Sequence, residues 1–508
     1  MSEALPSSAK IGVIGAGTMG SGIAHVAARA GHEVHLFDAS IDAIERGRQA
    51  IARDLAFLVG KGRLSEDDAQ ATLSRVHAAE RLSDTRDASL IVEAISEERG
   101  AKNELFSLLE TMVRPECILA TNTSSISITE LAQPLQYPGR LVGMHFFNPA
   151  PRMPLVEVIA GVTTDPAAFD CVYQTARAWG KTPVRARSIP GFIVNRVARP
   201  FYGEALRVLQ EQAADAATLD ALVRECGGFP MGPFELIDLI GLDVNLAVTG
   251  SVFEATAFDR RYAPSLIQQE LVRAGRLGRK TGQGFHRHGD NAPPPRPKAE
   301  APCTPAEIVR AVGDLGPARD LLERLRSGGV YVEARGGNAP GYLAMDTARL
   351  MLSDGRTATQ RSAEEGIPNL VLMDLALDYA RASRVAVAPA DQCDPQALER
   401  VVGALQSAGF LVSRLDDVAG LLVLRTVAML ANEAADLVAH GVAVAADIDI
   451  AMRLGVSYPK GPLAWADEIG PGLLARVLDN LRAHYGEERY RVSPALQRRR
   501  WSGTHFHE

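Results

Sequence analysis

The second half of the chain repeats part of the first half at one fixed spacing. A shift of 229 positions superimposes about 80 residues without a gap. Chance matches would not gather on glycines, prolines and acidic residues, so we infer a duplicated unit rather than two unrelated regions. The matches are Asp165-Pro166 with Asp394-Pro395, Gly180 with Gly409, Gly191 with Gly420, Arg196 with Arg425, Glu204-Ala205 with Glu433-Ala434, Asp220 with Asp449, Pro230 with Pro459, Gly232-Pro233 with Gly461-Pro462, and Asp238 with Asp467.

Residues 10–189 carry the pattern of a parallel sheet. Short apolar runs alternate with amphipathic segments, which is typical of strands joined by crossover helices. A helical insertion is expected at about residues 41–80. The expected strands are at residues 10–14, 33–37, 90–93, 118–120, 141–144 and 155–159, and the first helix at 18–30.

Three further regions follow, and a proline-rich linker at 291–304 divides them. Residues 190–290 show helical patterns, including one over 192–210, and the repeat places a second helical copy at 411–508. Residues 305–410 hold strand-like runs but no glycine-rich loop after the first strand. The expected fold class is therefore α/β: an N-terminal Rossmann-like parallel sheet over residues 1–189, an all-α domain, a reduced α/β remnant, and a second copy of the all-α domain.

Composition and charge argue against some kinds of binding partner. The chain has 54 basic and 61 acidic residues, and its net charge of −7 argues against a general nucleic-acid binder. No apolar run is long enough to cross a membrane, and the first ten residues lack the pattern of a secretory signal. The five cysteines form no C-x-x-C pair, which favours a reducing compartment and no metal site. We expect a cytoplasmic protein.

A glycine-rich loop follows the first expected strand and opens the first expected helix. In Gly15-Ala-Gly-Thr-Met-Gly20, the first glycine permits a tight turn, Gly17 lets a pyrophosphate approach the backbone, and Gly20 lets helix and strand pack closely. Asp38 ends the second strand, where a carboxylate binds ribose hydroxyls and repels a 2′-phosphate. This pattern predicts NAD binding rather than a purely structural turn. Thr18 and Met19 complete the predicted cofactor loop.

Polar residues with catalytic potential follow later strands. His145 precedes Glu157 by twelve positions, and the turn at Asn148-Pro149 can bring the two side chains together. A histidine held by a carboxylate is a general base for work near neutral pH. Ser124 follows the strand at 118–120, at the sheet edge where such folds bind ligands, and Asn195 sits within an apolar helical run.

Five motifs resemble the 3-hydroxyacyl-CoA dehydrogenase family over residues 10–285. The resemblance implies oxidation of an (S)-3-hydroxyacyl-CoA by NAD, with His145 and Glu157 as the catalytic pair and with Ser124 and Asn195 beside the substrate oxygen. The two-copy arrangement resembles bacterial members of phenylacetate breakdown that act on 3-hydroxyadipyl-CoA; 3-hydroxybutyryl-CoA is the other candidate substrate. The motifs are TNTSS at 121–125, HFFNP at 145–149, LVEVI at 155–159, PGFIVNR at 190–196 and MGPFELID at 231–238.

The same resemblance implies further contacts. Glu97, Lys102 and Asn122 are expected to contact the cofactor. Lys61 and Arg63 are expected to bind the phosphates of the CoA chain, although a solvated helix face explains them equally well; Arg48 and Arg53 lie on the same insertion. The resemblance shows no dedicated anchor for a distal substrate carboxylate, for which Arg152, Arg196 and Arg199 are candidates only.

The repeat predicts that only the first copy is catalytic. At the shift of 229, Asn195 falls on Leu424 and Glu157 on Ala386, and no histidine lies between His288 and His440. We therefore expect one active site per chain. The second helical copy is expected to pack on the first like a dimer partner or to complete the acyl-binding cleft, and the helical domains can support a homo-oligomer. The alternative functions are a CoA-independent β-hydroxyacid dehydrogenase and a non-catalytic NAD-binding scaffold.

Overall fold

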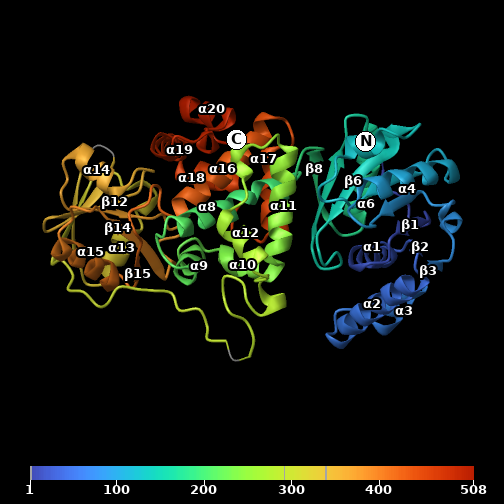
Figure 1. Cartoon of the computed structure of the whole chain (residues 1–508), viewed down its shortest axis with the longest axis horizontal. Coiled ribbons are helices and arrows are strands. Elements are labelled where there is room, and N and C mark those ends of the chain that lie inside the picture. Colours follow the sequence, from blue (N-terminus) through green and yellow to red (C-terminus); the bar gives the residue numbers. More distant parts are fainter. Residues whose placement is uncertain (1–2, 291, 338–339, 508) are drawn as a thin grey trace. The chain divides into compact units, whose positions relative to one another are not determined.

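The computed structural model describes residues 3–290, 292–337 and 340–507 of the chain (Figure 1). The expected boundary residues 1, 291 and 508 lie outside this description. The chain forms two compact units. The first unit comprises residues 1–196 together with 440–456, and the second comprises 197–439 together with 457–508.

An eight-stranded sheet forms the centre of the first unit, in the order β3-β2-β1-β4-β5-β6-β7-β8. All neighbouring pairs are parallel except β6 and β7, which are antiparallel. The six strands from β3 to β6 have the order of a doubly wound dinucleotide-binding sheet, which confirms the expected fold class. The strands are β1 (Ile11–Ile14), β2 (Val34–Phe37), β3 (Val76–Ala79), β4 (Leu90–Glu93), β5 (Ile118–Thr121), β6 (Leu141–Phe146), β7 (Leu155–Ala160) and β8 (Thr182–Arg187).

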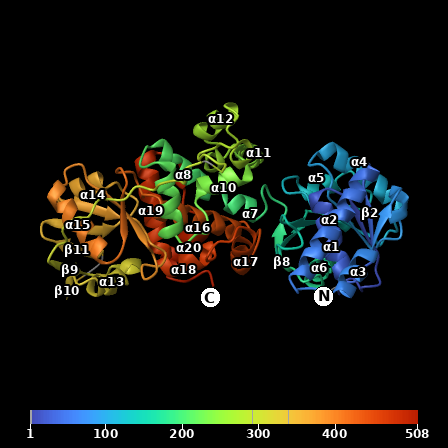
Figure 2. The same cartoon turned by 90° about the horizontal axis from the view of Figure 1, so that it is seen from below.

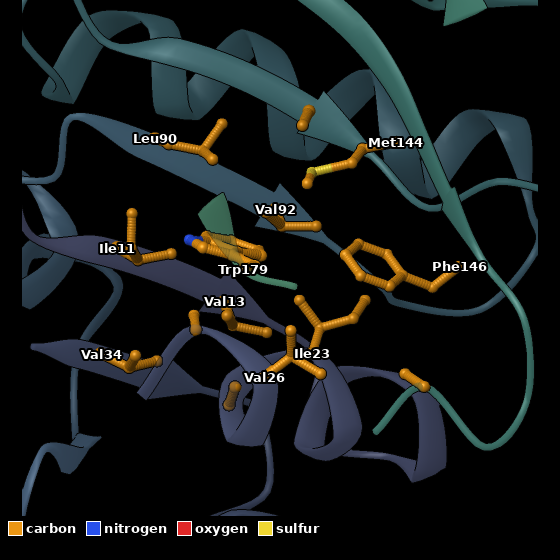
Figure 3. Close-up of a cluster of buried hydrophobic side chains, with 14 of the residues drawn as sticks. Ile11, Val13, Ile23, Val26, Val34, Leu90, Val92, Met144, Phe146 and Trp179 are labelled. Atoms are coloured by element: carbon orange, nitrogen blue, oxygen red, sulfur yellow. The ribbon is translucent and has the colours of Figure 1, made fainter. Parts of the chain in front are cut away.

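Alternate apolar residues of these strands build the main core. Ile11 and Val13 of β1, with Leu90 of β4, are fully buried on one face of the sheet, where Ile23 and Val26 of the first helix cover them (Figure 3). Side chains two residues apart share a face of a strand, so Ile11 and Val13 lie in one layer beneath the first helix. The helices of this unit's sheet domain are α1 (Thr18–Arg29), α2 (Ile41–Gly60), α3 (Glu66–Ser74), α4 (Arg99–Met112), α5 (Ile128–Ala132) and α6 (Pro166–Ala178).

The insertion at 41–80 is a helical hairpin of α2 and α3 that ends in a strand. Ser40 and Ser65 accept hydrogen bonds from the backbone at the starts of α2 and α3 and so act as N-caps. Strand β3 then pairs with β2 at the edge of the sheet. The expectation of helix through residue 80 was wrong over β3, because the pairing with β2 sets the conformation of this short Val-His-Ala-Ala run.

A seven-stranded sheet lies in the second unit (Figure 2). Its last four strands repeat the pattern of β5 to β8: β12 and β13 are parallel, β13 and β14 antiparallel, and β14 and β15 parallel. The last strand, β15, lies wholly beyond residue 410, where we expected this region to end. The elements are β9 (Ile308–Val312), α13 (Leu321–Ser327), β10 (Tyr331–Arg335), β11 (Tyr342–Met345), β12 (Ala348–Leu352), α14 (Ala358–Glu365), β13 (Leu370–Met373), β14 (Arg384–Pro389), α15 (Pro395–Ser407) and β15 (Leu411–Arg414).

The two helical copies follow the two sheets. The expected helix at 192–210 is interrupted, because Gly191 and Phe192 both have positive φ and helix begins only at Val194. The first copy contains α7 (Val194–Val197), α8 (Arg199–Gln210), α9 (Ala216–Glu225), α10 (Pro233–Ile240), α11 (Leu242–Ala255) and α12 (Leu266–Arg273). The second contains α16 (Val423–Ala439), α17 (Ala445–Gly455), α18 (Pro462–Ile469), α19 (Pro471–Tyr485) and α20 (Pro494–Ser502).

Within the described residues, no single helix is long and apolar enough to cross a membrane; only α10 and α11, taken together as a bent pair, reach the required length and apolarity.

A buried ionic network joins α8 of the first copy to α16 of the second. Arg425 and Glu204 are both completely buried, and Nε of Arg425 donates to Oε2 of Glu204 at 2.8 Å. The same guanidinium donates to Glu211 at 3.2 Å and to the hydroxyls of Tyr485 and Tyr490 at 2.9 and 2.7 Å. Burying a charge is costly unless its hydrogen bonds are made, and this network makes them.

The contacts across these two helices are reciprocal. Tyr490 of the second copy donates to Glu204 of the first at 3.1 Å, and Tyr262 of the first copy donates to Glu433 of the second. Glu433 corresponds to Glu204 in the repeat, and it also pairs with Arg261. Reciprocal contacts of this kind are typical of a two-fold dimer interface, so in this respect the two helical copies pack like dimer partners within one chain.

Replacing Arg425 should strongly destabilise the second unit. In Arg425→Met, the buried Glu204 loses the cation at its Oε2 and keeps only Arg207 at its Oε1, and we expect the free energy of unfolding in urea to fall by ~3–5 kcal/mol. Arg273→Met is the matched control, because the pair of Arg273 with Glu270 lies on the surface and exposed pairs contribute little. Equal effects of the two substitutions would contradict the structural role of the network.

Candidate active site

The glycine loop has the geometry that a dinucleotide requires. Gly15 has φ of +102°, and a Cβ there would lie 2.5 Å from the carbonyl oxygen of Ala94. A Cβ on Gly20 would lie 1.7 Å from the carbonyl oxygen of Gly15. Gly17 differs, because nothing lies within 4 Å of the position of its Cβ. The loop therefore needs two glycines for its own packing, whereas at Gly17 the missing side chain leaves open space at the start of α1, where a pyrophosphate fits.

Asp38 is held at the end of β2 beside this loop. Its Oδ2 accepts the backbone N–H of Ala16 at 2.8 Å, and its Oδ1 accepts that of Ser40 at 3.0 Å. The carboxylate is partly exposed, and each of its oxygens retains capacity for another hydrogen bond. Thr18 is exposed and Met19 half-buried in the first turn of α1. These residues fit the adenosine half of NAD.

His145 and Glu157 form a buried pair on neighbouring strands. They lie directly opposite each other in the antiparallel pairing of β6 and β7, so strand register brings them together, not only the turn after His145. Nδ1 of His145 lies 2.7 Å from Oε2 of Glu157. Glu157 is completely buried and His145 is 6% exposed. In the neutral ring, a proton on Nδ1 leaves the lone pair on Nε2, so the imidazole can accept a proton at Nε2.

Backbone groups complete the surroundings of Glu157. Its Oε1 accepts the N–H groups of Ile193 and Val194, both at 3.0 Å. These donors lie at the start of α7, whose second residue is the half-buried Asn195. One carboxylate therefore links the histidine to the element that carries Asn195. No residue type in the sequence indicates these donors beyond the Pro-Gly turn before them, because they are main-chain groups.

Ser124 belongs to a network around Glu97. Oε1 of Glu97 accepts from the backbone N–H of Ser124 at 2.9 Å, from Oγ1 of Thr123 at 2.6 Å and from Oγ of Ser125 at 2.8 Å. Lys102, which is 1% exposed, lies 3.3 Å from the other oxygen of Glu97 and 2.5 Å from Glu93. Burial by itself raises the pKa of Glu97, but the hydrogen bond from Thr123, the Lys102 ammonium and the two serines together hold it below the usual value. Glu97 is therefore an ionised group that fixes the loop carrying Ser124.

The remaining candidates lie in three different places. The side-chain oxygen of Asn122 accepts the N–H of Phe146 at 2.8 Å, so Asn122 ties the end of β5 to the end of β6. Lys61 and Arg63 are exposed in the turn between α2 and α3. Lys61 lies over the Phe57 ring, 5.7 Å from its centroid, and Arg152 lies over the same ring at 5.5 Å. Arg48 and Arg53 are on α2. The structure thus brings the four catalytic candidates to one end of the sheet and groups Lys61 with Arg152 on the hairpin.

The second sheet retains the framework of this site without its chemistry. Asp374 stands 229 positions after His145, and its N–H donates to Ala386, the counterpart of Glu157, at 3.0 Å. The carboxylate of Asp374 accepts the N–H groups of Leu422, Val423 and Leu424, all within 2.9 Å. The second sheet therefore also has a carboxylate that accepts hydrogen bonds from the start of the following helix. This carboxylate lies at the end of β13, the counterpart of β6, rather than on β14, the counterpart of β7.

The counterpart of Ser124 follows from strand pairing, because β5 and β12 align at a shift of 230 rather than 229: Leu119 pairs with Leu141, and Arg349 pairs with Leu370. Ser127 and Thr357 cap α5 and α14 in the same way, and the residues three positions earlier are Ser124 and Asp354. Asp354 pairs with Arg356 at 2.6 Å. Asn195 corresponds to Leu424. All four candidate residues of the first copy therefore have non-equivalent counterparts in the second.

A glycine loop for NAD beside a histidine–glutamate pair defines a nicotinamide-dependent dehydrogenase. Known families agree with this class. Residues 10–189 match the family model described as 3-hydroxyacyl-CoA dehydrogenase, NAD binding domain, and residues 191–288 and 420–504 both match its C-terminal domain. Residues 350–418 match a 3-hydroxybutyryl-CoA dehydrogenase reduced Rossmann-fold domain. The two matches to one C-terminal model confirm the duplication.

Similar proteins include both one-copy and two-copy relatives. The chain is 42% identical to 3-hydroxyadipyl-CoA dehydrogenase of Escherichia coli, over 96% of this chain and 97% of that protein. It is 43% identical to a probable 3-hydroxybutyryl-CoA dehydrogenase of Deinococcus radiodurans, over 55% of this chain and all of that protein. A crystal structure titled 3-hydroxybutyryl-CoA dehydrogenase, from Escherichia coli, matches with a TM-score of 0.89 and 41% identity, over 98% of this chain and 99% of that one.

The chain belongs to the 3-hydroxyacyl-CoA dehydrogenase family. It is an NAD-dependent enzyme that oxidises 3-hydroxyacyl-CoA to 3-oxoacyl-CoA, as the resemblance of its motifs implied.

Substitutions at two glycines should separate cofactor binding from folding. Gly17→Val should weaken NADH binding at least tenfold and leave the melting temperature unchanged, because the side chain enters the open space and no protein atom lies within 4 Å of its Cβ position. Gly20→Val is the contrasting variant, since its side chain meets the Gly15 carbonyl and should unfold the domain. Titration of NADH fluorescence and thermal melts measure the two effects. Undiminished NADH binding in Gly17→Val would contradict the assignment of the loop.

Proposed function

We propose that His145 is the base that removes the hydroxyl proton from the substrate. When bound, NAD supplies the acceptor for the hydride. The alcohol oxygen gives its proton to Nε2 of His145 as the hydride leaves the neighbouring carbon. Glu157 keeps the proton of Nδ1 in place and stabilises the imidazolium that forms. The observation that carries this proposal is the 2.7 Å contact between Nδ1 of His145 and the buried Glu157. A positioned base of this kind contributes roughly 10²–10⁴ in rate.

Ser124 and Asn195 are proposed to hold the substrate oxygen. Both can donate a hydrogen bond to an oxygen that gains carbonyl character. The network around Glu97 fixes the backbone of Ser124, and the turn that binds Glu157 precedes Asn195. The protein thus holds the donors before substrate arrives, which is the condition for stabilising charge that develops during reaction.

The CoA part of the substrate is proposed to lie along the α2–α3 hairpin. Lys61 and Arg63 are exposed there, and the guanidinium of Arg152 lies on the same Phe57 ring as Lys61. Cationic side chains of this kind suit the phosphates of CoA. A CoA-independent β-hydroxyacid dehydrogenase would not need this group, so the hairpin favours the thioester substrate.

We propose (S)-3-hydroxyadipyl-CoA as the preferred substrate. The support is the similarity over nearly the whole chain to the Escherichia coli 3-hydroxyadipyl-CoA dehydrogenase, including the second copy. The curated 3-hydroxybutyryl-CoA dehydrogenases of similar identity match about half of this chain, whereas the crystal structure titled 3-hydroxybutyryl-CoA dehydrogenase matches 98% of it, so 3-hydroxybutyryl-CoA stays the second candidate. A distal carboxylate needs a cationic partner. Arg152, Arg196 and Arg199 remain the candidates, of which Arg152 already pairs with Asp54 at 3.1 Å.

Two further proposals concern the compartment in which the enzyme works and its association with further copies of the chain. The structure shows Cys117, Cys171, Cys226, Cys303 and Cys393 as free thiols. This pattern is typical of a reducing compartment, and we propose that the enzyme works in the cytoplasm. We also propose that further copies of the chain associate through the helical domains.

The assignment of the base is tested by His145→Gln. We expect kcat for NAD reduction to fall by roughly 10²–10⁴, while the Kd of NADH stays at the wild-type value because the glycine loop is unchanged. His77→Gln is the matched control, because His77 lies in the same sheet but is exposed and pairs with Glu33. An active His145→Gln enzyme would rule out this mechanism.

The substrate assignment is tested by comparing two thioesters. Steady-state NAD reduction should give a higher kcat/KM with (S)-3-hydroxyadipyl-CoA than with (S)-3-hydroxybutyryl-CoA, because only the adipyl chain offers a carboxylate to a cationic side chain. Equal or higher kcat/KM with the butyryl substrate would contradict the preference but leave the mechanism intact.

A further inference from the structure

Helix α17 belongs to the second copy by sequence, yet it packs on the sheet that carries His145 and Glu157. It contacts β7 and β8 within the first unit. The backbone N–H of Arg187 donates to the carbonyl of Val442 at 3.0 Å, and that of Arg185 donates to Oδ2 of Asp447 at 3.0 Å. Strand β8 is the edge of its sheet, so the segment before α17 and the start of the helix cover N–H groups that would otherwise face outward.

The second unit contains the equivalent arrangement, with the roles of the two copies exchanged. There α9, from the first copy, packs on β14 of the second sheet. The N–H of Asp416 donates to the carbonyl of Ala213 at 3.0 Å, and these two residues correspond to Arg187 and Val442 at the shift of 229. Each sheet is therefore covered by a helix from the other copy. The repetition shows that the contact of α17 with β7 and β8 is a built feature of the duplicated fold.

Gly455, the last residue of α17, lies against two neighbours of Glu157. A Cβ on Gly455 would come within 2.8 Å of Cδ2 of Leu155 and within 3.0 Å of Cγ2 of Val194. Leu155 precedes Glu157 by two positions, so their side chains share one face of β7. The N–H of Val194 is one of the two backbone donors to Glu157. Gly455 has no positive φ, and alanine is the better helix former, so we attribute the glycine to this packing: a Cβ fits only if the methyl groups of Leu155 and Val194 shift.

In the first helical copy, the residue that corresponds to Gly455 is the larger Cys226. On the sheet that this copy covers, the residue that corresponds to Glu157 is the smaller Ala386. Cys226 stands 229 positions before Gly455, is 2% exposed, and its thiol donates to the carbonyl of Leu375 at 3.2 Å. The helix that it ends packs on β14, where Ala386 replaces Glu157. The strand that carries Glu157 thus packs against a helix with Gly455 at its end. The strand that carries Ala386 packs against a helix with Cys226 at its end.

We propose that Gly455 is a positioning residue of the active site. By letting the end of α17 approach closely, it sets the places of Leu155 and Val194, and through them the carboxylate of Glu157 that orients His145. The second copy, which lacks the catalytic residues, is in this way a working part of the active site of the first. This inference rests on the proposed role of Glu157.

A double-mutant cycle between Gly455 and Leu155 tests the proposal in the full chain. Gly455→Ala pushes on Leu155 and Val194, and Leu155→Val loosens the same contact. We expect each single variant to lower kcat about tenfold, since small misplacements of catalytic groups are costly, with KM and the Kd of NADH unchanged. The double variant should recover most of the wild-type kcat, because the shorter side chain makes room for the new methyl group. Gly472→Ala is the matched control: Gly472 is also in a helix of the second copy, and nothing lies within 4 Å of its Cβ position.

Several outcomes would overturn the proposal. These are a wild-type kcat in Gly455→Ala, an equal loss in Gly472→Ala, and additive losses in the double variant. If Gly455→Ala alone is insoluble, Leu155→Val and the double variant still decide the matter, because a double variant that is no more active than Leu155→Val overturns it. A failure here while His145→Gln is inactive removes only the role of Gly455. An active His145→Gln enzyme removes the proposed mechanism itself.

Discussion

The buried carboxylate of Glu157 is the interaction on which the site depends. One of its oxygens binds Nδ1 of His145, and the other binds the N–H groups of Ile193 and Val194. A carboxylate without exposure to water is tolerated only when its hydrogen bonds are made by fixed partners. Glu157 therefore couples two strands and the start of α7, and the places of His145 and of Asn195 are set together.

The duplication separates the structural part of this arrangement from the chemical part. In the second sheet, Asp374 also binds the start of the following helix, but from the strand position that His145 occupies in the first sheet. The fold thus needs a carboxylate under that helix in both copies. In the first copy this carboxylate is Glu157 and lies on the next strand, β7. His145 occupies the position directly opposite it on β6. The two sheets therefore differ in the strand that carries the buried carboxylate and in the presence of His145.

Much of the fold and of the candidate site could be predicted from the sequence, because strong local patterns indicate them. The glycine loop, the repeat and the family motifs gave the fold class, the order of regions and the cofactor. Two kinds of feature were out of reach. Partners that are backbone groups, such as the donors to Glu157, have no residue type to recognise. Contacts set by tertiary pairing also leave no local pattern: β3 forms because β2 is beside it, and Gly455 meets Leu155 although 300 positions separate them. The break before Val194 was missed because Phe192 takes a left-handed conformation that its residue type disfavours.

The tautomer of His145 tests the central claim most directly. Nitrogen-15 NMR of histidine-labelled protein, with the His145 signals identified by their loss in His145→Gln, reports which ring nitrogen carries the proton in the neutral ring. The account predicts a proton on Nδ1 and a free lone pair on Nε2, with this preference lost in Glu157→Gln. A proton on Nε2 in the unmodified enzyme would contradict it, because the ring could then not accept the substrate proton at that nitrogen.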